Sequence, residues 1–202
     1  VIVKEVININ YQETILSMAQ EKDGIITSSE ITTAKIPRIY LKIMTDKGLL
    51  VRIDRGIYSL PEVWEDEMYT LQCKYKKGIF SHGTALYIHK MSDRTPIKYE
   101  MTFPRGYHLK SKNELLKIRC SVNEIYNLGI EEALSPLGRK IKVYNIEKTI
   151  CDLLKTESDI QITKDAIKMY CNSRNRNITK LTEYAKKLNV ESKILTYLKV
   201  LL

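Results

Sequence analysis

The spacing of apolar residues predicts two helices near the start of the chain. Apolar positions recur three and four residues apart from Tyr11 onward, Asn10 is a favourable N-cap, and Asp23–Gly24 ends this first helix. A short extended piece comes next. Thr27 and Glu30 then have the spacing of a capping box, which predicts a short second helix.

A third helix and a hairpin follow. Ile36–Pro37 opens the helix, because proline suits a first turn, and Gly48 ends it. Its apolar stripe is expected to consist of Ile36, Ile39, Tyr40 and Ile43, and its outer side to carry Arg38, Leu41, Lys42 and Thr45. Residues 49–60 alternate in polarity and turn back at 54–56, which predicts the two strands of a hairpin.

This order of elements is typical of a winged helix-turn-helix, whose third helix enters the major groove of DNA. The residues expected to contact DNA are Ser28, Ser29, Thr32, Lys35, Arg38, Leu41, Lys42, Thr45, Arg52 and Arg55. For Leu41 two interpretations stay open, contact with a thymine methyl group or packing inside the protein. The alternative role of Ser28, Ser29 and Thr32 is to cap the second helix. The alternative for Arg52 and Arg55 is that they are solvated at the tip of the hairpin and contact no DNA. Because some winged helices only dock onto proteins, a protein-interaction module is the competing hypothesis.

The rest of the chain predicts a mixed α+β domain with a helical tail, so the expected fold class is α+β. Strands are expected at 97–103, 118–122 and 141–144, and helices at 62–75, from 81, and at 146–155, 163–172, 178–188 and 190–202. The expected domains are a winged helix-turn-helix over 1–62 and a second domain over 63–202. That second domain is mixed α+β to about residue 157, and its helical tail covers 160–202.

The charge of the chain favours polyanionic partners. Its 202 residues carry a net charge of +9, and Lys and Arg gain affinity by releasing counterions from phosphates. Most of the excess lies outside the N-terminal third. A candidate second basic face therefore consists of Lys74, Lys76, Lys77, Arg105, Lys110, Lys112, Arg174 and Arg176. Its ligand is expected to be DNA beside the operator or RNA, and a solvated surface is the alternative.

No residue pattern indicates catalysis or a bound metal. His82 and His89 lie seven residues apart without further ligands nearby, so packing or capping is expected for both. Glu147 and Asp152 lie five apart on one predicted helix and point in different directions, which disfavours an acid–base pair. The four cysteines are widely spaced and expected to be reduced thiols. We expect a cytoplasmic protein that is not an enzyme, with no cofactor, no metal and no membrane segment.

Three stretches resemble the AbiEi antitoxins of bacterial abortive-infection systems. The first is Met44–Tyr58, which is similar to the winged end of that family. The second is Phe80–His89, similar to a Ser-x-x-(Ser/Thr)-Ala-Leu helix, and the third is Gly138–Leu154, similar to a strand and a Glu-(Arg/Lys)-Thr-x-x-Asp-Leu helix. Lys148 stands where arginine is commoner, so a role that needs a forked guanidinium is in doubt there.

The resemblance implies a type IV toxin–antitoxin operon. It further implies that the antitoxin represses its own promoter by binding inverted repeats in double-stranded operator DNA. By the same resemblance, its C-terminal domain is expected to counter a nucleotidyltransferase-like toxin without forming a stable complex. A plain transcriptional regulator without neutralising activity is the alternative.

Overall fold

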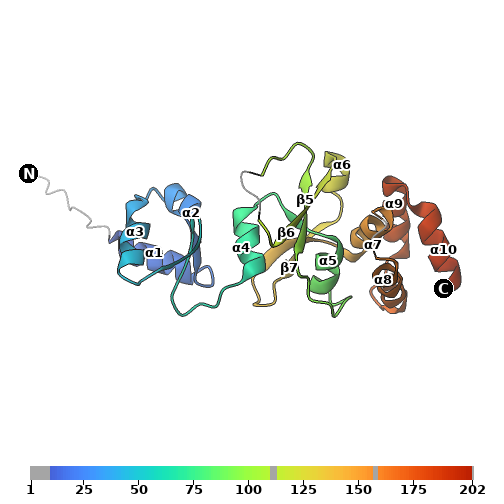
Figure 1. Cartoon of the computed structure of the whole chain (residues 1–202), viewed down its shortest axis with the longest axis horizontal. Helices are drawn as coiled ribbons and strands as arrows, with labels where there is room; N and C mark the ends of the chain where they lie inside the picture. The colour runs from blue at the N-terminus through green and yellow to red at the C-terminus, as the bar shows by residue number, and fades with distance from the viewer. Residues whose placement is uncertain (1–9, 110–112, 157–158, 202) are drawn as a thin grey trace, which may run out of the picture. The chain divides into compact units, whose positions relative to one another are not determined.

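The chain forms two compact units. The computed structural model describes residues 10–109, 113–156 and 159–201, and the units are Val1–Lys74 and Tyr75–Leu202 (Figure 1). The sequence places the boundary after residue 62, whereas the structure keeps helix α4 (Glu67–Lys74) with the first unit. The ammonium of Lys74 lies 2.6 Å from the carboxylate of Asp54, which ties the helix to the hairpin. Among the described residues, no helix has the length and apolar content to cross a membrane.

The first unit has the predicted winged helix-turn-helix order. Its elements are α1 (Tyr11–Gln20), β1 (Ile25–Thr27), α2 (Ser28–Thr33), α3 (Ile39–Asp46), β2 (Val51–Asp54) and β3 (Ile57–Ser59). The three strands form an antiparallel sheet in the order β1-β3-β2. The hairpin β2–β3 is the wing, and β1, which precedes α2, adds a third strand to it.

Side-chain caps fix where the first two helices begin. The side chain of Asn10 accepts hydrogen bonds from the backbone of the first turn of α1. At α2 the capping box is complete, because Thr27 Oγ1 accepts from the Glu30 amide while Glu30 Oε2 accepts from the Thr27 amide at 2.7 Å. Gly56 makes the wing turn with φ +78°, and a Cβ there would lie 2.7 Å from the Ser28 hydroxyl. Glycine is therefore required at this turn.

A small apolar core holds the three helices and the sheet together. The buried side chains are Ile15, Ala19, Ile26, Ile31, Ile36, Leu41, Met44, Leu50 and Leu60. The rings of Tyr11 and Tyr40 pack at its edge with their centroids 5.0 Å apart. Since each large aliphatic side chain contributes about 1.5–3 kcal/mol when fully buried, this core determines which face of α3 remains outside.

The second unit is built on a five-stranded mixed sheet. Its strands are β4 (Ile79–Phe80), β5 (Tyr99–Pro104), β6 (Leu116–Ser121), β7 (Ile130–Leu134) and β8 (Lys140–Tyr144), in the order β6-β5-β4-β8-β7. The pairs β4–β5 and β7–β8 are antiparallel, and the pairs β5–β6 and β4–β8 are parallel. Its first helices are α5 (His82–Ile88), α6 (Asn123–Tyr126) and α7 (Ile146–Lys155). The sequence pattern missed β4, β7 and α6.

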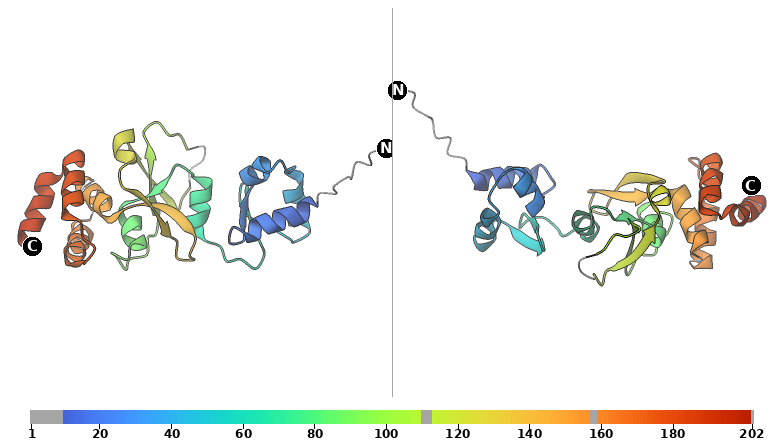
Figure 2. Two further views of the ribbon diagram at one scale, coloured as in Figure 1. Left: turned by 180° about the vertical axis from the view of Figure 1, so that it is seen from behind. Right: turned by 90° about the horizontal axis from the view of Figure 1, so that it is seen from above.

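The chain ends in the predicted run of helices. They are α8 (Ile160–Asn172), α9 (Ile178–Leu188) and α10 (Glu191–Leu201). Figures 1 and 2 show α7 between the sheet and these three helices. The apolar side of α7 packs with theirs in one core, which includes Ile150, Leu154, Ile167, Leu181 and Ile194. The predicted fold class, a winged helix-turn-helix followed by a mixed domain with a helical tail, is confirmed.

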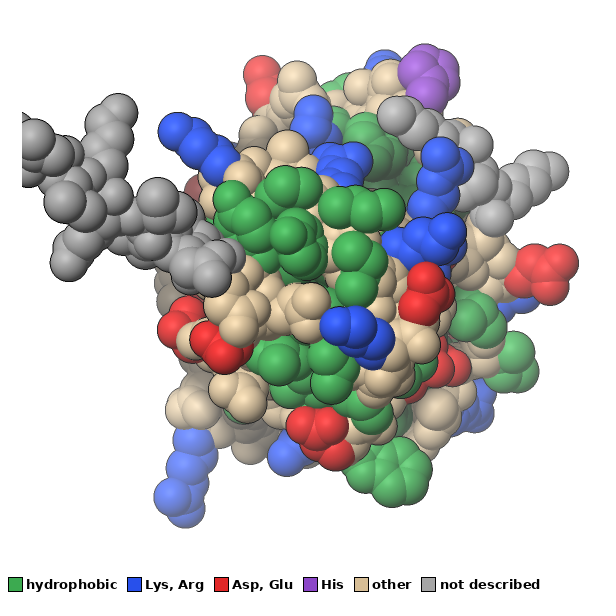
Figure 3. Space-filling view, turned by 90° about the vertical axis from the view of Figure 1, so that its left-hand side faces the viewer, with side chains coloured by type: hydrophobic (Ala, Val, Ile, Leu, Met, Phe, Trp, Pro, Cys, Tyr) green, Lys and Arg blue, Asp and Glu red, His purple; other side chains and the backbone are tan. Residues whose placement is uncertain are grey.

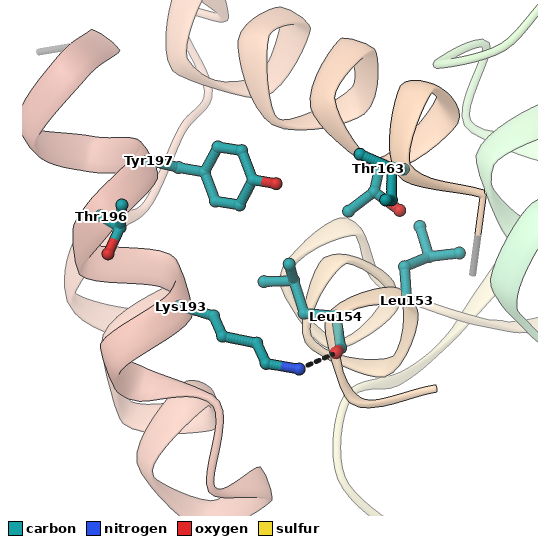
Figure 4. A pocket seen from close by; sticks show the side chains of 7 residues that line it. Leu153, Leu154, Thr163, Lys193, Thr196 and Tyr197 are labelled. Carbon is teal, nitrogen blue, oxygen red and sulfur yellow. Dashed lines mark hydrogen bonds between the residues drawn. The ribbon is translucent and has the colours of Figure 1, made fainter. Parts of the chain in front are cut away.

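An apolar hollow of about 520 Å³ lies among α7, α8 and α10 (Figure 4). Leu153 and Leu154 form one wall, and the ring of Tyr197 extends from α10 across the opening toward Thr163. Lys193 Nζ donates a hydrogen bond to the Leu154 carbonyl oxygen at 3.2 Å. This contact joins the last helix to the C-terminal end of α7.

Candidate nucleic-acid interface

Helix α3 presents a different face to solvent from the one predicted. Leu41 and Met44 are buried, with only 2% of Leu41 exposed, whereas Ile39 is 57% exposed. The expected stripe of Ile36, Ile39, Tyr40 and Ile43 is therefore wrong for Ile39, and Leu41 is not on the outer side. Of the two interpretations of Leu41, packing is correct and contact with a thymine methyl group is excluded.

The apolar pattern of this helix is ambiguous, which explains the error. Five of the six residues from Ile39 to Met44 are apolar. More than one set of apolar positions in this helix therefore has helical spacing, and the pattern does not show which set is buried. The core of the first unit decides between them. Leu41 and Met44 complete the cluster around Ile15 and Ile31, and that contact turns Ile39 outward.

The outer face of α3 carries two parallel strips. Arg38 and Lys42 are both exposed and lie four residues apart, so they are neighbours on the helix surface. Ile39 and the half-buried Ile43 form the second strip beside them. The prediction that the helix directs Arg38 and Lys42 outward agrees with this arrangement. A face with two cations and two aliphatic side chains matches the acceptors and thymine methyl groups of a major groove.

Arg38 is held in position by the preceding helix. Its Nε donates to Thr32 Oγ1 at 2.7 Å, and that hydroxyl in turn donates to the Ser28 carbonyl oxygen at 2.8 Å. Within the described residues, no protein group pairs with the two terminal nitrogens of Arg38, so both are available for a bidentate contact with guanine. Thr32, which is expected to contact phosphate, thus orients Arg38.

The other predicted contact residues of α2 and α3 have local partners or are exposed. Ser29 Oγ lies 2.9 Å from Thr27 Oγ1, and Thr45 Oγ1 donates to the Leu41 carbonyl oxygen at 2.7 Å. Ser28 is half-buried, and its amide donates to the Gly56 carbonyl oxygen. Lys35 is exposed on the turn between α2 and α3, with φ +58°. The hydroxyls thus make the turn rigid, and Lys35 adds a charge beside it.

The wing adds two exposed arginines. Arg52 and Arg55 lie on either side of Asp54, and the Arg55 amide donates to Asp54 Oδ1 at 2.6 Å. Partial burial acts to raise the pKa of Asp54, but hydrogen bonds from Lys74 and Arg55 outweigh it and lower that pKa. The Asp54 carboxylate is thus engaged by Lys74 and by the turn. Arg52 Nε donates to the Asp54 carbonyl oxygen at 3.4 Å, and both arginines are exposed.

The comparisons with known proteins concern this part of the chain. Residues 13–61 match the sequence model of the AbiEi_4 family, described as a transcriptional regulator, AbiEi antitoxin. These residues are thus similar to the AbiEi antitoxin family of transcriptional regulators. The match covers α2, α3 and the wing, and all ten predicted DNA-contact residues lie inside it. We call residues 13–61 the AbiEi domain below.

The AbiEi domain and the rest of the chain together resemble a solved structure. The crystal structure of the RV2827C protein from Mycobacterium tuberculosis matches 93% of this chain and 76% of its own, with a TM-score of 0.57 and 12% sequence identity. At this identity the likeness shows the fold alone. Among curated proteins, no significant match is found.

The surface of the AbiEi domain combines apolar and cationic side chains. Figure 3 looks onto the side where α3 lies in Figure 1, and hydrophobic side chains gather there between Lys and Arg side chains. The exposed large apolar residues of the domain are Ile39, Leu49 and Val51. An apolar strip bordered by cations suits either the methyl groups and phosphates of DNA or a protein partner.

The described residues of the predicted second basic face lie on several elements. Lys74 belongs to the first unit and pairs with Asp54. Lys76 is exposed, and Lys77 and Arg105 line one hollow of about 560 Å³. Arg174 and Arg176 are exposed in the connection between α8 and α9, where Arg176 Nη1 donates to the Cys171 carbonyl oxygen. Lys110 and Lys112 lie outside the described residues.

A buried ion pair on α7 was not predicted as such. Lys148 is 1% exposed, and its Nζ lies 2.6 and 2.5 Å from the two carboxylate oxygens of Asp152. The same ammonium lies 4.4 Å from the centroid of the Tyr144 ring. Lys148 thus stands where arginine is commoner in the AbiEi antitoxins. Its single side-chain nitrogen contacts both carboxylate oxygens of Asp152. Glu147 bonds instead to Tyr170, so the expectation that the two acids point apart is met.

A second polar group surrounds His82 in the same unit. Burial lowers the pKa of His82 to about 4, so its ring is neutral at pH 7. Burial acts to raise the pKa of Glu100, but hydrogen bonds from Lys117, Arg119 and the Gly83 amide lower it. In the parts of the chain that the structure describes, no three His, Cys, Asp or Glu side chains are arranged to hold a metal ion. The group joins α5 to β5 and β6 and has the character of a structural network.

Proposed function

We propose that this chain represses its own operon by binding inverted repeats in double-stranded operator DNA through the AbiEi domain. Helix α3 enters the major groove, and the wing contacts the neighbouring phosphates. The second unit counters a nucleotidyltransferase-like toxin of a type IV abortive-infection system, without a stable complex. The site of action is the cytoplasm. The family match of residues 13–61 supports the regulatory part of this proposal, and the resemblance in Phe80–His89 and Gly138–Leu154 supports the antitoxin part.

One observation carries the DNA-binding proposal. Within the matched residues, the exposed face of α3 has two cations at helical spacing, and Thr32 orients one of them. The N-terminal residues of a recognition helix are the ones that contact base edges, and Arg38 and Ile39 occupy that position. The wing adds Arg52 and Arg55 at a second place on the same unit.

The salt dependence of binding tests the proposal. A duplex selected from a random pool by the full chain is titrated at several salt concentrations. If Arg52 and Arg55 each neutralise a phosphate, the logarithm of the affinity falls with the logarithm of the salt concentration at a slope of roughly −2. A slope near zero, or failure to select any duplex, contradicts the proposal.

A protein-docking function is the second candidate, because Ile39, Leu49 and Val51 are exposed together with the cations. Association through apolar side chains depends little on salt, so the same titration separates the two functions. If the domain instead binds a protein, replacing Ile39 weakens that association. In that case neither the variant nor the unmodified chain binds DNA.

Ile39 takes the thymine-reading role that was one of the two interpretations of Leu41. We expect deoxyuridine in place of one thymine of the selected site to weaken binding by about fourfold, since a buried methyl group is worth about 0.8 kcal/mol. Ile39→Ala removes the partner of that methyl group, so its affinity should be the same for thymine and deoxyuridine. Ile97→Ala, at a 92% exposed position in the second unit, is the matched control and should keep the fourfold difference. If deoxyuridine weakens binding equally for Ile39→Ala and for the unmodified chain, this contact is excluded.

A further inference from the structure

The second unit has a polar hollow that no part of the proposed function uses. It has a volume of about 560 Å³ and lies between the loop that follows β5, the short helix α6 and the segment before β4. Side chains that line it include Lys77, Arg105, Tyr107, His108, Asn123 and Tyr126. Its lining contains two cations, a histidine, amides and phenols, and none of its lining residues is a carboxylate.

The two cations of the hollow differ from those nearby on β6. Lys117 and Arg119 both bond to Glu100, each at 2.9 Å. Lys77 and Arg105 are exposed, and within the described ranges no carboxylate lies within ion-pair distance of either. Two uncompensated charges that line one hollow create a positive potential there. Arginine and lysine in such a setting favour a phosphate group.

A tyrosine in the hollow is oriented for stacking. The ring of Tyr107 lies parallel to that of Phe103, with the centroids 4.9 Å apart and 7° between the planes. Phe103 is completely buried, whereas Tyr107 is half-buried and lines the hollow. One face of the ring thus packs on the core, and the residue lines the hollow. An aromatic ring held in this way is a platform for a nucleic-acid base.

The backbone around the cations is also fixed. Tyr126 Oη donates to the Lys77 carbonyl oxygen at 2.6 Å, which joins α6 to the segment before β4. Arg105 follows β5, and its amide donates to the Ser121 carbonyl oxygen at 2.7 Å. The two charges therefore stand on anchored backbone, although their side chains reach solvent.

We propose that this hollow binds a nucleotide, with the phosphate on Lys77 and Arg105 and the base stacked on Tyr107. Asn123 lines the same hollow, and we assign its amide to the edge of the base. A free nucleotide and a nucleotide within single-stranded RNA share this chemistry. The site lies in the second unit and is independent of DNA binding by α3.

The test uses the full chain carrying Arg38→Ala and Lys42→Ala, so that binding through α3 does not contribute. A fluorescent ADP analogue and a five-residue oligouridylate are titrated separately. We expect saturable binding of at least one probe. Arg105→Ala should weaken it by about tenfold, as expected for loss of a charged phosphate contact. Lys98→Ala, an exposed cation elsewhere in this unit, is the control and should have no effect.

The stacking part of the proposal has its own variants. Tyr107→Leu should weaken binding by about tenfold, because base stacking on an aromatic ring is lost, while Tyr107→Phe should retain it. Stronger binding of ADP identifies a free nucleotide, and stronger binding of the oligomer identifies RNA. Absence of saturable binding overturns the proposal, as does competition by pyrophosphate as strong as by ADP. Either failure leaves the DNA-binding proposal untouched, because that proposal is measured on the unmodified α3.

Discussion

Replacing Arg38 and Lys42 together with alanine is expected to abolish sequence-specific DNA binding. A good bidentate contact to a base is worth about 1–3 kcal/mol, so losing two contacts weakens specific binding at least about thirtyfold. Both side chains are exposed, and the only hydrogen bond that the described structure gives either side chain joins Arg38 to Thr32. The fold should therefore stay intact. A gel-shift titration with the selected duplex measures the loss, and circular dichroism confirms the fold.

The matched control is Lys164→Ala with Lys168→Ala. These residues are also exposed cations four apart on a helix, α8, so the change in net charge and spacing is the same. This control should bind DNA with nearly unchanged affinity. The Arg38 and Lys42 variant, expressed from an unrelated promoter, should still protect cells that express the toxin, since neutralisation is assigned to the second unit. An unchanged affinity of this variant for DNA would refute the role of α3.

Replacing Asp152 with alanine is expected to destabilise the second unit by about 3–5 kcal/mol. Burial lowers the pKa of Lys148, and the charge of Asp152 counteracts this effect. Without the carboxylate a buried ammonium has lost its partner, which is among the most costly single changes in a protein core. For a unit of this size the melting temperature should fall by roughly 10–20 °C. Thermal unfolding followed by circular dichroism measures the change.

An exposed pair on α9 provides the control for this prediction. Lys187 and Glu183 have the same spacing and lie 2.7 Å apart, but both are exposed to solvent. Glu183→Ala should leave the melting temperature nearly unchanged, because exposed ion pairs contribute little. Replacing both members of the buried pair, with Lys148→Met and Asp152→Leu, should recover much of the lost stability. Equal effects of Asp152→Ala and Glu183→Ala would show that burial of the α7 pair has no energetic consequence.

Local signals predicted most helices of this chain. Asn10 caps α1, the capping box of Thr27 and Glu30 begins α2, and the predicted bounds of the helix at 178–188 match α9. These signals act within one or two turns, so they can be read from neighbouring residues. The charged outer face of α3 was predictable for the same reason, because the opposite face of the helix carries no Lys or Arg that corresponds to Arg38 and Lys42.

Features that depend on distant contacts were not predictable. Leu41 and Ile39 are both aliphatic, and only the core formed with α1 and α2 decides which one is buried. Strand β4 has two residues and gains its place from pairing with β5 and β8. Strand β7 contains Glu131 and Glu132, which have low strand propensity, and it forms because β8 pairs with it.

Modification of guanine N7 tests the central claim, that the exposed face of α3 enters the major groove. Methylation at N7 adds a group in the major groove, where Arg38 would contact guanine, whereas methylation of adenine at N3 lies in the minor groove. The account predicts that full-length protein binds poorly to selected duplexes methylated at one or more guanine N7 positions. It also predicts that adenine N3 methylation at A·T base pairs beside these guanines has little effect. Normal binding to every N7-methylated duplex, with interference only from the minor groove, would contradict it.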